Sequence, residues 1–156
     1  MKVEKGDVLD YIGKSDIVCV TTNSVVKANG ELVMGAGCAL AFKKKFPELP
    51  KTFGSKVKVK GNRPVIGCKS KNTIIVSFPT KYHYSGKSDL ELIKNSARVL
   101  VQIADFYKSK NIYIPSPGTG LGKLSKEEVY KELSMILDDR FIILELWHEI
   151  DEKNLF

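Results

Sequence analysis

Residues 74–114 read IIVSFPTKYHYSGKSDLELIKNSARVLVQIADFYKSKNIYI. Two short runs in this segment, residues 74–78 and 112–114, are apolar and rich in β-branched residues, which predicts buried strands. Between them the apolar residues recur at helical spacing, at Leu90, Ile93, Ala97, Leu100, Val101 and Ala104. The preceding Ser88-Asp89-Leu90-Glu91 has the form of a capping box, so we expect a helix to begin there.

The same alternation of strand and helix continues on both sides of this segment. The patterns predict strands at Ile17-Val18-Cys19-Val20-Thr21 and at residues 141–146. A second capping box, Ser125-Lys126-Glu127-Glu128, precedes a helix that carries Val129, Leu133, Ile136 and Leu137. A third helix is predicted from about Ala36 to Phe46, where Pro47 ends it. Strands separated by helices of this length predict an α/β fold whose largely parallel sheet is covered on both faces.

Length and composition narrow the class of protein. The 156 residues are 43% hydrophobic and 28% charged, which indicates a single globular domain over residues 1–156. No apolar run is long enough for a membrane span, and the first residues form no signal sequence, so we expect a cytoplasmic protein without a membrane partner. Three dispersed cysteines and two histidines predict reduced thiols and neither a metal site nor a cofactor.

Positive charge is concentrated in one part of the chain. The net charge is +7, and the segment from Lys43 to Lys81 holds eleven Lys or Arg and one acid, which gives +10. The remaining 14 bases and 17 acids sum to −3. Such a region can attract nucleic acid or another phosphate-bearing ligand. A solvated lysine-rich face is the favoured interpretation, because the lysines lack interleaved aromatic residues for stacking.

Two glycine-rich loops each follow a predicted strand and precede a predicted helix. Residues 21–37 read TTNSVVKANGELVMGAG, and residues 115–123 read PSPGTGLGK. Ligands of open α/β sheets bind at the carboxyl ends of the strands, where glycines let backbone N–H groups approach phosphates. The second loop has neither the Walker A nor the Rossmann spacing. Glycines can also serve tight turns alone, but two such loops beside a basic region favour a nucleotide-like ligand with a pyrophosphate.

Four elements, taken in order, resemble the macro domain family. They are Gly6-Asp7-Val8, the strand end Val20-Thr21-Thr22-Asn23, the segment Asn29 to Gly37, and Pro117-Gly118-Thr119-Gly120-Leu121-Gly122. The resemblance covers nearly the whole chain and is greatest to short single-domain macro domains of bacteria and phages. It implies a three-layer α/β/α sandwich with a mixed, mostly parallel sheet, and a cleft for ADP-ribose or a derivative of it.

The resemblance also assigns ligand-binding residues. It places Asp7, with Val8 beside it, at the adenine amino group. The distal ribose is assigned to Asn23, Asn29, Gly35, Ala36 and Gly37, and the diphosphate to Gly118, Thr119, Gly120 and Leu121. Gly122 is a further ligand-binding candidate in the same loop. Carboxylate, amide and backbone N–H groups are suitable partners for an amine, hydroxyls and phosphates respectively. Trp147 is a candidate to stack on adenine or to pack in the core.

The catalytic candidates are Lys81 and Asn29. The chain resembles hydrolases that release ADP-ribose from protein carboxylates, in which the lysine of a Thr-Lys pair attacks the distal ribose, as Thr80-Lys81 would here. That branch carries a catalytic Asp where this chain has Gly122. In the alternative reaction, removal of phosphate from ADP-ribose 1''-phosphate, Lys81 would bind the phosphate and Asn29 or His83 would assist a water molecule.

The sequence therefore leaves several functions open. The first is hydrolysis of ADP-ribose 1''-phosphate or of an ADP-ribosyl ester, with an ADP-ribosylated protein as a partner. The second is a non-catalytic domain that binds or sequesters ADP-ribose, which Gly122 favours. Nucleic-acid binding by the basic segment is the third. The residues favour the enzyme over the binding module and both over nucleic acid.

Overall fold

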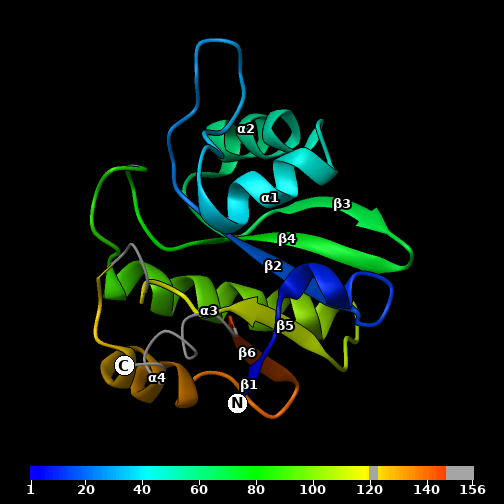
Figure 1. The fold of residues 1–156 in the computed structure, drawn as a ribbon, viewed down its shortest axis with the longest axis vertical. Coiled ribbons are helices and arrows are strands. Elements are labelled where there is room, and N and C mark those ends of the chain that lie inside the picture. Colours follow the sequence, from blue (N-terminus) through cyan, green and yellow to red (C-terminus); the bar gives the residue numbers. More distant parts are fainter. Residues whose placement is uncertain (120–122, 147–156) are drawn as a thin grey trace, which may run out of the picture.

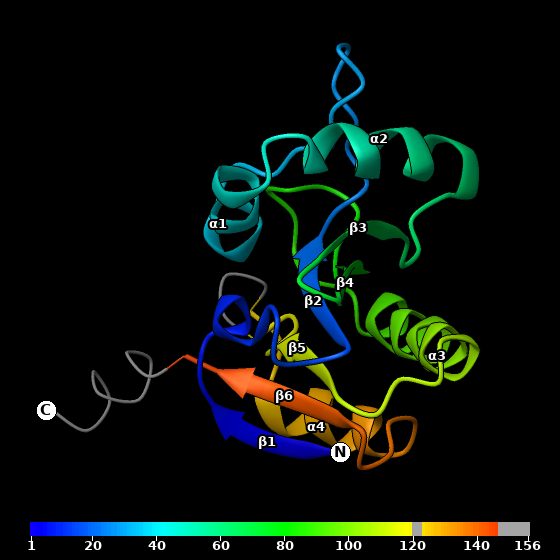
Figure 2. The same ribbon diagram turned by 90° about the vertical axis from the view of Figure 1, so that its right-hand side faces the viewer.

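The computed structural model describes residues 1–119 and 123–146. It contains a six-stranded sheet with the order β1-β6-β5-β2-β4-β3. The strands are β1 (Lys2–Lys5), β2 (Ile17–Thr22), β3 (Ile66–Ser70), β4 (Thr73–Pro79), β5 (Ile112–Pro115) and β6 (Phe141–Glu145). Only the edge strand β3 is antiparallel to its neighbour, and the pairs β1–β6, β6–β5, β5–β2 and β2–β4 are parallel. Figure 2 shows β1 and β6 side by side, pointing the same way.

Helices cover both faces of the sheet, as Figure 1 shows. The helices α1 (Gly37–Lys45) and α2 (Leu49–Lys60) lie on one face with the short 3-10 helix η1 (Val8–Tyr11), and α3 (Leu90–Phe106) and α4 (Lys126–Ser134) lie on the other. The predicted three-layer α/β/α sandwich with a mixed, mostly parallel sheet is thus confirmed. Within the described residues, no helix combines the length and apolarity needed to cross a membrane.

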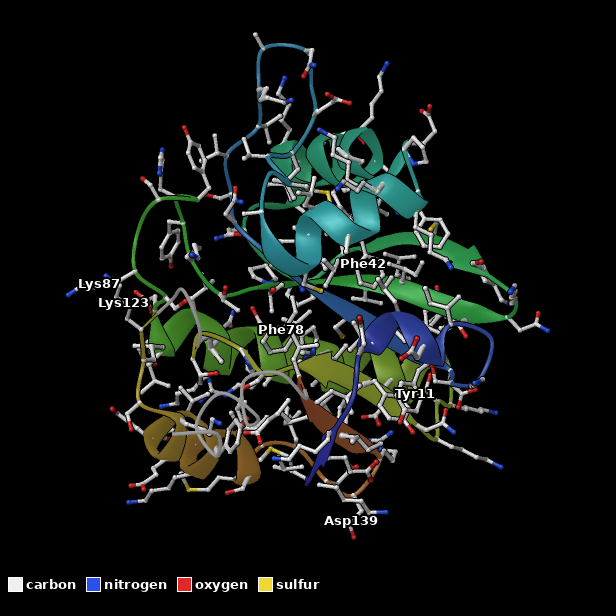
Figure 3. All side chains as sticks on the ribbon, viewed as in Figure 1. Tyr11, Phe42, Phe78, Lys87, Lys123 and Asp139 are labelled. Atoms are coloured by element: carbon white, nitrogen blue, oxygen red, sulfur yellow. The ribbon has the colours of Figure 1, made fainter. Side chains whose placement is uncertain are left out.

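The alternation of side chains along β2 builds the two cores. Ile17 and Cys19 point into the cluster formed with α3 and α4, whereas Val18 and Val20 point into the cluster formed with α1 and α2. All four residues are fully buried. Figure 3 labels one large buried side chain of each core, Phe42 and Phe78, on opposite sides of the sheet.

Some predicted boundaries differ from the structure. Helix α3 is capped by Asp89, whose carboxylate accepts from Leu92 N at 2.9 Å, and Ser88 takes no part in that cap. Helix α4 is capped by Ser125 as expected but ends at Ser134, so Leu137 joins the core from outside the helix. The strands β1 and β3 were not predicted, because their short sequences are mostly solvent-accessible or polar.

The sequence analysis also missed α2. Its Pro50 lies in the first turn, where proline is tolerated, and Leu49, Phe53 and Val57 recur every four residues on its buried face. That spacing is a helical signal obscured by the interleaved lysines and by Gly54. The helix supports the segment 23–34, whose hairpin projects beyond α2 in Figures 1 and 2 and is closed by a bridge between Val26 and Leu32.

Gly54 allows the hairpin to lie against α2. A Cβ at this position would overlap the carbonyl oxygen of Gly30 and come within 2.9 Å of Leu32 N. Leu32 N in turn donates to Pro50 O at 2.9 Å. The hairpin leads directly into the loop before α1, so its position on α2 sets the position of that loop.

We predict that Gly54→Ala lowers the free energy of unfolding by about 1–3 kcal/mol, because the added methyl group forces the hairpin away from α2. Guanidinium denaturation of the two proteins measures the difference. Gly35→Ala is the matched control, since a Cβ at Gly35 meets nothing within 4 Å. Equal losses for the two variants would contradict the packing role of Gly54.

Candidate functional site

Five parallel strands end at the same edge of the sheet. The register pairs Thr22 with Pro79, Pro115 with Leu144 and Lys5 with Glu145. A cavity of about 660 Å³ opens at this edge, a size typical of small-molecule sites. Residues that end or follow each strand line it, among them Asp7 after β1, Leu146 after β6, Ser116 after β5, Asn23 after β2 and Lys81 after β4.

The charges of the cavity lie at its two ends. Among the described lining residues, Asp7 is the only carboxylate and Lys81 is the only cation. They follow β1 and β4, which are four strand spacings apart in the sheet. At about 4.8 Å a spacing, the two strand ends are roughly 19 Å apart. The cavity is therefore elongated, with an acceptor at one end and an amine at the other.

One carboxylate oxygen of Asp7 is available to accept a hydrogen bond from a ligand. Its Oδ1 accepts from Leu9 N at 3.0 Å and caps η1, which fixes the carboxylate at the cavity edge. Its Oδ2 accepts no hydrogen bond from the described residues. Val8, the next residue, is buried and also lines the cavity.

The N-terminus of α1 supplies backbone donors. The N-cap residue Ala36 offers no side-chain acceptor, so no side chain satisfies the first N–H groups of the helix. Gly35, Ala36, Gly37 and Cys38 all line the cavity. Gly37 has φ +56°, a conformation that favours glycine. This segment therefore suits an anionic or hydroxyl-bearing ligand.

Cys38 is not a reactive group in this cavity. Burial and, to a smaller extent, the nearby Asp7 raise the pKa of its thiol to about 12, although a backbone hydrogen bond at Thr21 acts in the opposite direction. The thiol is therefore protonated at neutral pH and is a poor nucleophile. All three cysteines are free thiols, as predicted.

The two predicted asparagines have different positions. Asn23 lines the cavity, but its amide braces the hairpin, since Nδ2 donates to Val33 O at 3.0 Å and Oδ1 accepts from Val25 N at 2.8 Å. Asn29 lies at the exposed turn of the hairpin, outside the cavity lining, where its side chain bonds to Glu31. The structure thus does not bring Asn29 to Lys81, because the hairpin carries it away from the sheet.

Gly118 and Ser88 meet beside the end of β5. Gly118 has φ +74°, and a Cβ there would come within 2.8 Å of Ile93 Cδ1 and 3.1 Å of Ser88 Cβ. Ser88 lines the cavity with only 7% of its surface exposed, and its hydroxyl has no partner within the described part of the chain. A buried hydroxyl without a partner is costly, so a ligand hydrogen bond would be favourable there.

A chain of hydroxyls links the cavity to a buried carboxylate. Ser116 bonds to Thr119 at 2.8 Å and to the Tyr130 hydroxyl at 2.7 Å, and Tyr130 donates to Glu145 Oε2 at 2.7 Å. Burial would raise the pKa of Glu145, but hydrogen bonds from Lys126, Tyr130 and Lys5 and the charge of Lys126 lower it overall.

The ionised state of Glu145 sets the direction of every bond in this chain. A carboxylate only accepts, so the single Tyr130 proton points to Glu145 and Ser116 must donate to Tyr130. Thr119 must then donate to Ser116. Consequently Ser116 Oγ can offer the cavity only a lone pair, which suits a ligand hydroxyl or a water molecule.

The remaining predicted residues contribute less to the described cavity. Thr119 is held by Ser116 and is not part of the lining. His83 lies outside the lining and is bonded by Ser85, although its neighbour Tyr84 does line the cavity. Gly120, Leu121, Gly122 and Trp147 fall outside the described residues.

Sequence reasoning missed Ser88, Ser116, Tyr130 and Glu145. Ser88 was assigned to a capping box, although the adjacent Asp89 is an equally good cap. The other three come from β5, α4 and β6, and no local spacing relates them. Ser116 could have been found from its place directly after a predicted strand. Glu145 could have been found because it is a charged residue within an otherwise apolar strand.

The family model of the macro domain matches residues 25–133. The chain therefore belongs to the macro domain family, and the predicted family is confirmed. It is 29% identical over 128 residues to the DNA ADP-ribosyl glycohydrolases of Mycobacterium bovis and Mycobacterium tuberculosis. These matches cover 78% of this chain and 36% of the relatives, so the chain spans little more than a third of their length.

Solved structures agree with this assignment. The macrodomain of Thermus aquaticus DarG superposes with a TM-score of 0.75 at 25% identity, covering 92% of this chain and 95% of that one. Thermosipho africanus DarTG in complex with ADP-ribose has a TM-score of 0.73 at 22% identity, covering 96% of this chain and 42% of that one. The second likeness concerns the fold alone.

We predict that Glu145→Gln lowers the free energy of unfolding by roughly 1.5–3 kcal/mol at pH 7, because the neutral amide cannot make the charged hydrogen bonds of the carboxylate. Because folding lowers the pKa of Glu145, its contribution is complete above the pKa of the unfolded chain and disappears as pH falls through the folded pKa. The two proteins should therefore begin to converge as pH falls below about 4, the ordinary pKa of a glutamate.

Denaturation at pH 7 and pH 3.5 measures this convergence. Glu127→Gln, an exposed acid of the same α4 region, is the control and should change stability little at either pH. A difference between Glu145→Gln and the parent that is the same at both pH values would contradict the ionised role of Glu145.

Proposed function

We propose that this domain binds ADP-ribose and hydrolyses the bond between its distal ribose and an acceptor, and that the acceptor is DNA. The observation that carries the proposal is the elongated cavity with Asp7 at one end and Lys81 at the other. The names of the mycobacterial relatives support DNA as the acceptor, and the ADP-ribose complex of Thermosipho africanus DarTG supports the ligand.

In the proposed complex, the ligand follows the chemistry of the lining. The adenine amino group donates to Asp7. The diphosphate lies between the backbone of Gly118 and the N-terminus of α1, where N–H groups are available. The Ser88 hydroxyl, buried beside Gly118, donates to a phosphate oxygen. The distal ribose then reaches Lys81 at the other end.

The proposed reaction uses Lys81 as the nucleophile. Its deprotonated Nζ bonds to C1'' of the distal ribose, the bond from C1'' to the acceptor breaks, and the proton released from Nζ goes to the acceptor. Water then adds to C1'', the C1''–Nζ bond breaks, and Lys81 is regenerated. The sum is ADP-ribosyl acceptor plus water giving acceptor and ADP-ribose.

The other functions considered above are supported less well by the cavity lining. Release of ADP-ribose from protein carboxylates would use the same lysine chemistry on an ester. Removal of the 1''-phosphate was predicted with Asn29 or His83 as the assisting side chain, and neither lines the cavity. The position of the expected Asp is held by Gly122, which keeps a non-catalytic binding module as the second candidate.

We predict that Lys81→Ala abolishes release of ADP-ribose from an ADP-ribosylated oligonucleotide while it changes ADP-ribose affinity by less than about tenfold. Single-turnover assays and calorimetry measure the two quantities. Lys87→Ala is the control, because Lys87 belongs to the same loop but lies outside the lining, at the edge of the molecule in Figure 3. Turnover retained by Lys81→Ala would remove the lysine from the proposed reaction, and ADP-ribose binding without turnover by the parent would favour the binding module.

We predict that Ser88→Ala weakens ADP-ribose binding about tenfold but does not lower the free energy of unfolding without ligand, since the lost hydroxyl has no protein partner. Ser96→Ala is the matched control on α3. Its buried hydroxyl donates to Pro79 O at 2.8 Å, so this variant should lose stability. A stability loss for Ser88→Ala equal to that of Ser96→Ala would oppose the ligand role.

A further inference from the structure

A second groove lies away from the cavity, along the edge strand β3. It has a volume of about 500 Å³ and runs between the C-terminal halves of α2 and α3, which cover opposite faces of the sheet. Figure 2 shows α2 above and α3 below, with β3 between them. Its apolar floor includes Val65, Ile66 and Ile103. The catalytic proposal assigns no role to this groove.

The walls of the groove are basic. Lys56, Lys60 and Arg63 line it, and no carboxylate is among its described lining residues. Lys56 is anchored, since its Nζ donates to Ile66 O at 2.6 Å, whereas Lys60 and Arg63 are exposed. Neither Lys60 nor Arg63 takes part in an ion pair within residues 1–119 and 123–146. Their charges are therefore available to an anionic partner.

Two aromatic rings form the far end of the groove. Phe106 and Tyr107 line it and are 78% and 46% exposed. Their ring centroids are 4.9 Å apart with the planes at 77°, so each ring braces the other. These exposed rings line the same groove as the unpaired Lys60 and Arg63. The basic segment thus does acquire aromatic partners, but they come from the end of α3, about 45 residues later in the chain.

A hydrogen bond links the loop beside the groove to the loop that lines the cavity. Asn62, next to Arg63, donates through Nδ2 to the carbonyl oxygen of Lys81 at 3.2 Å. From there α3 leads away from the cavity: Asp89 N donates to Thr80 O at 2.8 Å, and Phe106 lies 16 residues further along the helix axis from Leu90. At 1.5 Å per residue this distance is about 24 Å. This length runs from the cavity to the far end of the groove, which borders α3 only from Val99 onward, so a strand that reaches both sites must be several nucleotides long.

We propose that this groove binds single-stranded DNA, with Lys60 and Arg63 on phosphates and Phe106 and Tyr107 stacking on bases. The inference rests on the proposed function, since it supplies a path for the strand whose modified nucleotide enters the cavity. Proteins that bind single-stranded nucleic acids commonly combine cations with exposed aromatic rings, because every base has a face that can stack on a ring. An acidic peptide would use the cations but gain little from aromatic rings in place of other apolar side chains.

The experiment measures binding of an unmodified, fluorescently labelled dT12 oligonucleotide to the whole chain over a range of salt concentrations. One variant, Lys60→Ala/Arg63→Ala, removes the unpaired charges. A second, Phe106→Leu/Tyr107→Leu, keeps apolar side chains but removes the rings. The control, Lys14→Ala/Lys131→Ala, removes two exposed lysines from other parts of the surface.

We expect each groove variant to bind dT12 at least about fivefold more weakly than the parent, with unchanged ADP-ribose affinity. The charge variant should also show a salt slope shallower by about 1.4, since each phosphate contact on a single strand contributes about 0.7. The ring variant should keep the parent slope. The control should bind dT12 as tightly as the parent. Its salt slope should differ from that of the parent by less than the slope of the charge variant does.

Wild-type affinity for dT12 in both groove variants would overturn the inference. So would tighter binding of a poly-glutamate peptide than of dT12 at the same salt concentration, which would assign the groove to an acidic protein. The outcome is separable from that of the proposed function. If the parent does not release ADP-ribose from DNA but the groove variants bind dT12 more weakly, the proposed reaction is wrong and the groove assignment holds. If the parent releases ADP-ribose and the groove variants bind dT12 as tightly as the parent, the groove assignment is wrong and the reaction holds.

Discussion

The parallel register of the sheet is the constraint on which the rest of the molecule depends. Because β1, β6, β5, β2 and β4 run the same way, the segments that leave them converge on one edge. Pairing of Thr22 with Pro79 brings the segments after β2 and β4 together, although these two residues are 57 positions apart in sequence. A slip of one residue in β2 would exchange Ile17 and Val18 between the two cores, so burial on both faces fixes the register. The cavity is a consequence of that packing.

Much of the fold could be predicted from the sequence, because its strongest signals are local. The buried strands near residues 17, 74, 112 and 141 and the helix at Leu90 to Phe106 follow from periodicity within a dozen residues. Helix α2 was missed because its buried face has only Leu49, Phe53 and Val57 among many lysines. The short edge strands carry too few buried side chains for periodicity to indicate them.

The candidate site was only partly predictable. The resemblance to the macro domain family assigned Asp7, Gly37 and Gly118 to the ligand, and the cavity lining includes all three. The position of Asn29 depends on how the hairpin lies on Gly54, a contact between segments that no local pattern reports. The Ser116–Tyr130–Glu145 chain likewise requires the tertiary approach of β5, α4 and β6. Long-range contacts, and not residue types, were the missing information.

The chemistry of the domain follows from where charge is placed. The cavity holds one described carboxylate and one described cation at opposite ends, with backbone donors between them. The other basic side chains of the 43–81 segment do not line this cavity. The ionised Glu145 turns the hydroxyls of Ser116 and Thr119 away from donating to the ligand. In the proposed complex, backbone N–H groups and Ser88 therefore bind the phosphates, and acceptors and the lysine contact the sugar.

The central claim is the orientation of ADP-ribose in the cavity, and a crystal structure of the domain soaked with ADP-ribose tests it most directly. The account predicts the adenine amino group within hydrogen-bond distance of the Asp7 carboxylate and C1'' of the distal ribose beside Lys81 Nζ. A complex with the ribose at Asp7 and the adenine at Lys81, or with the ligand outside this cavity, would contradict it.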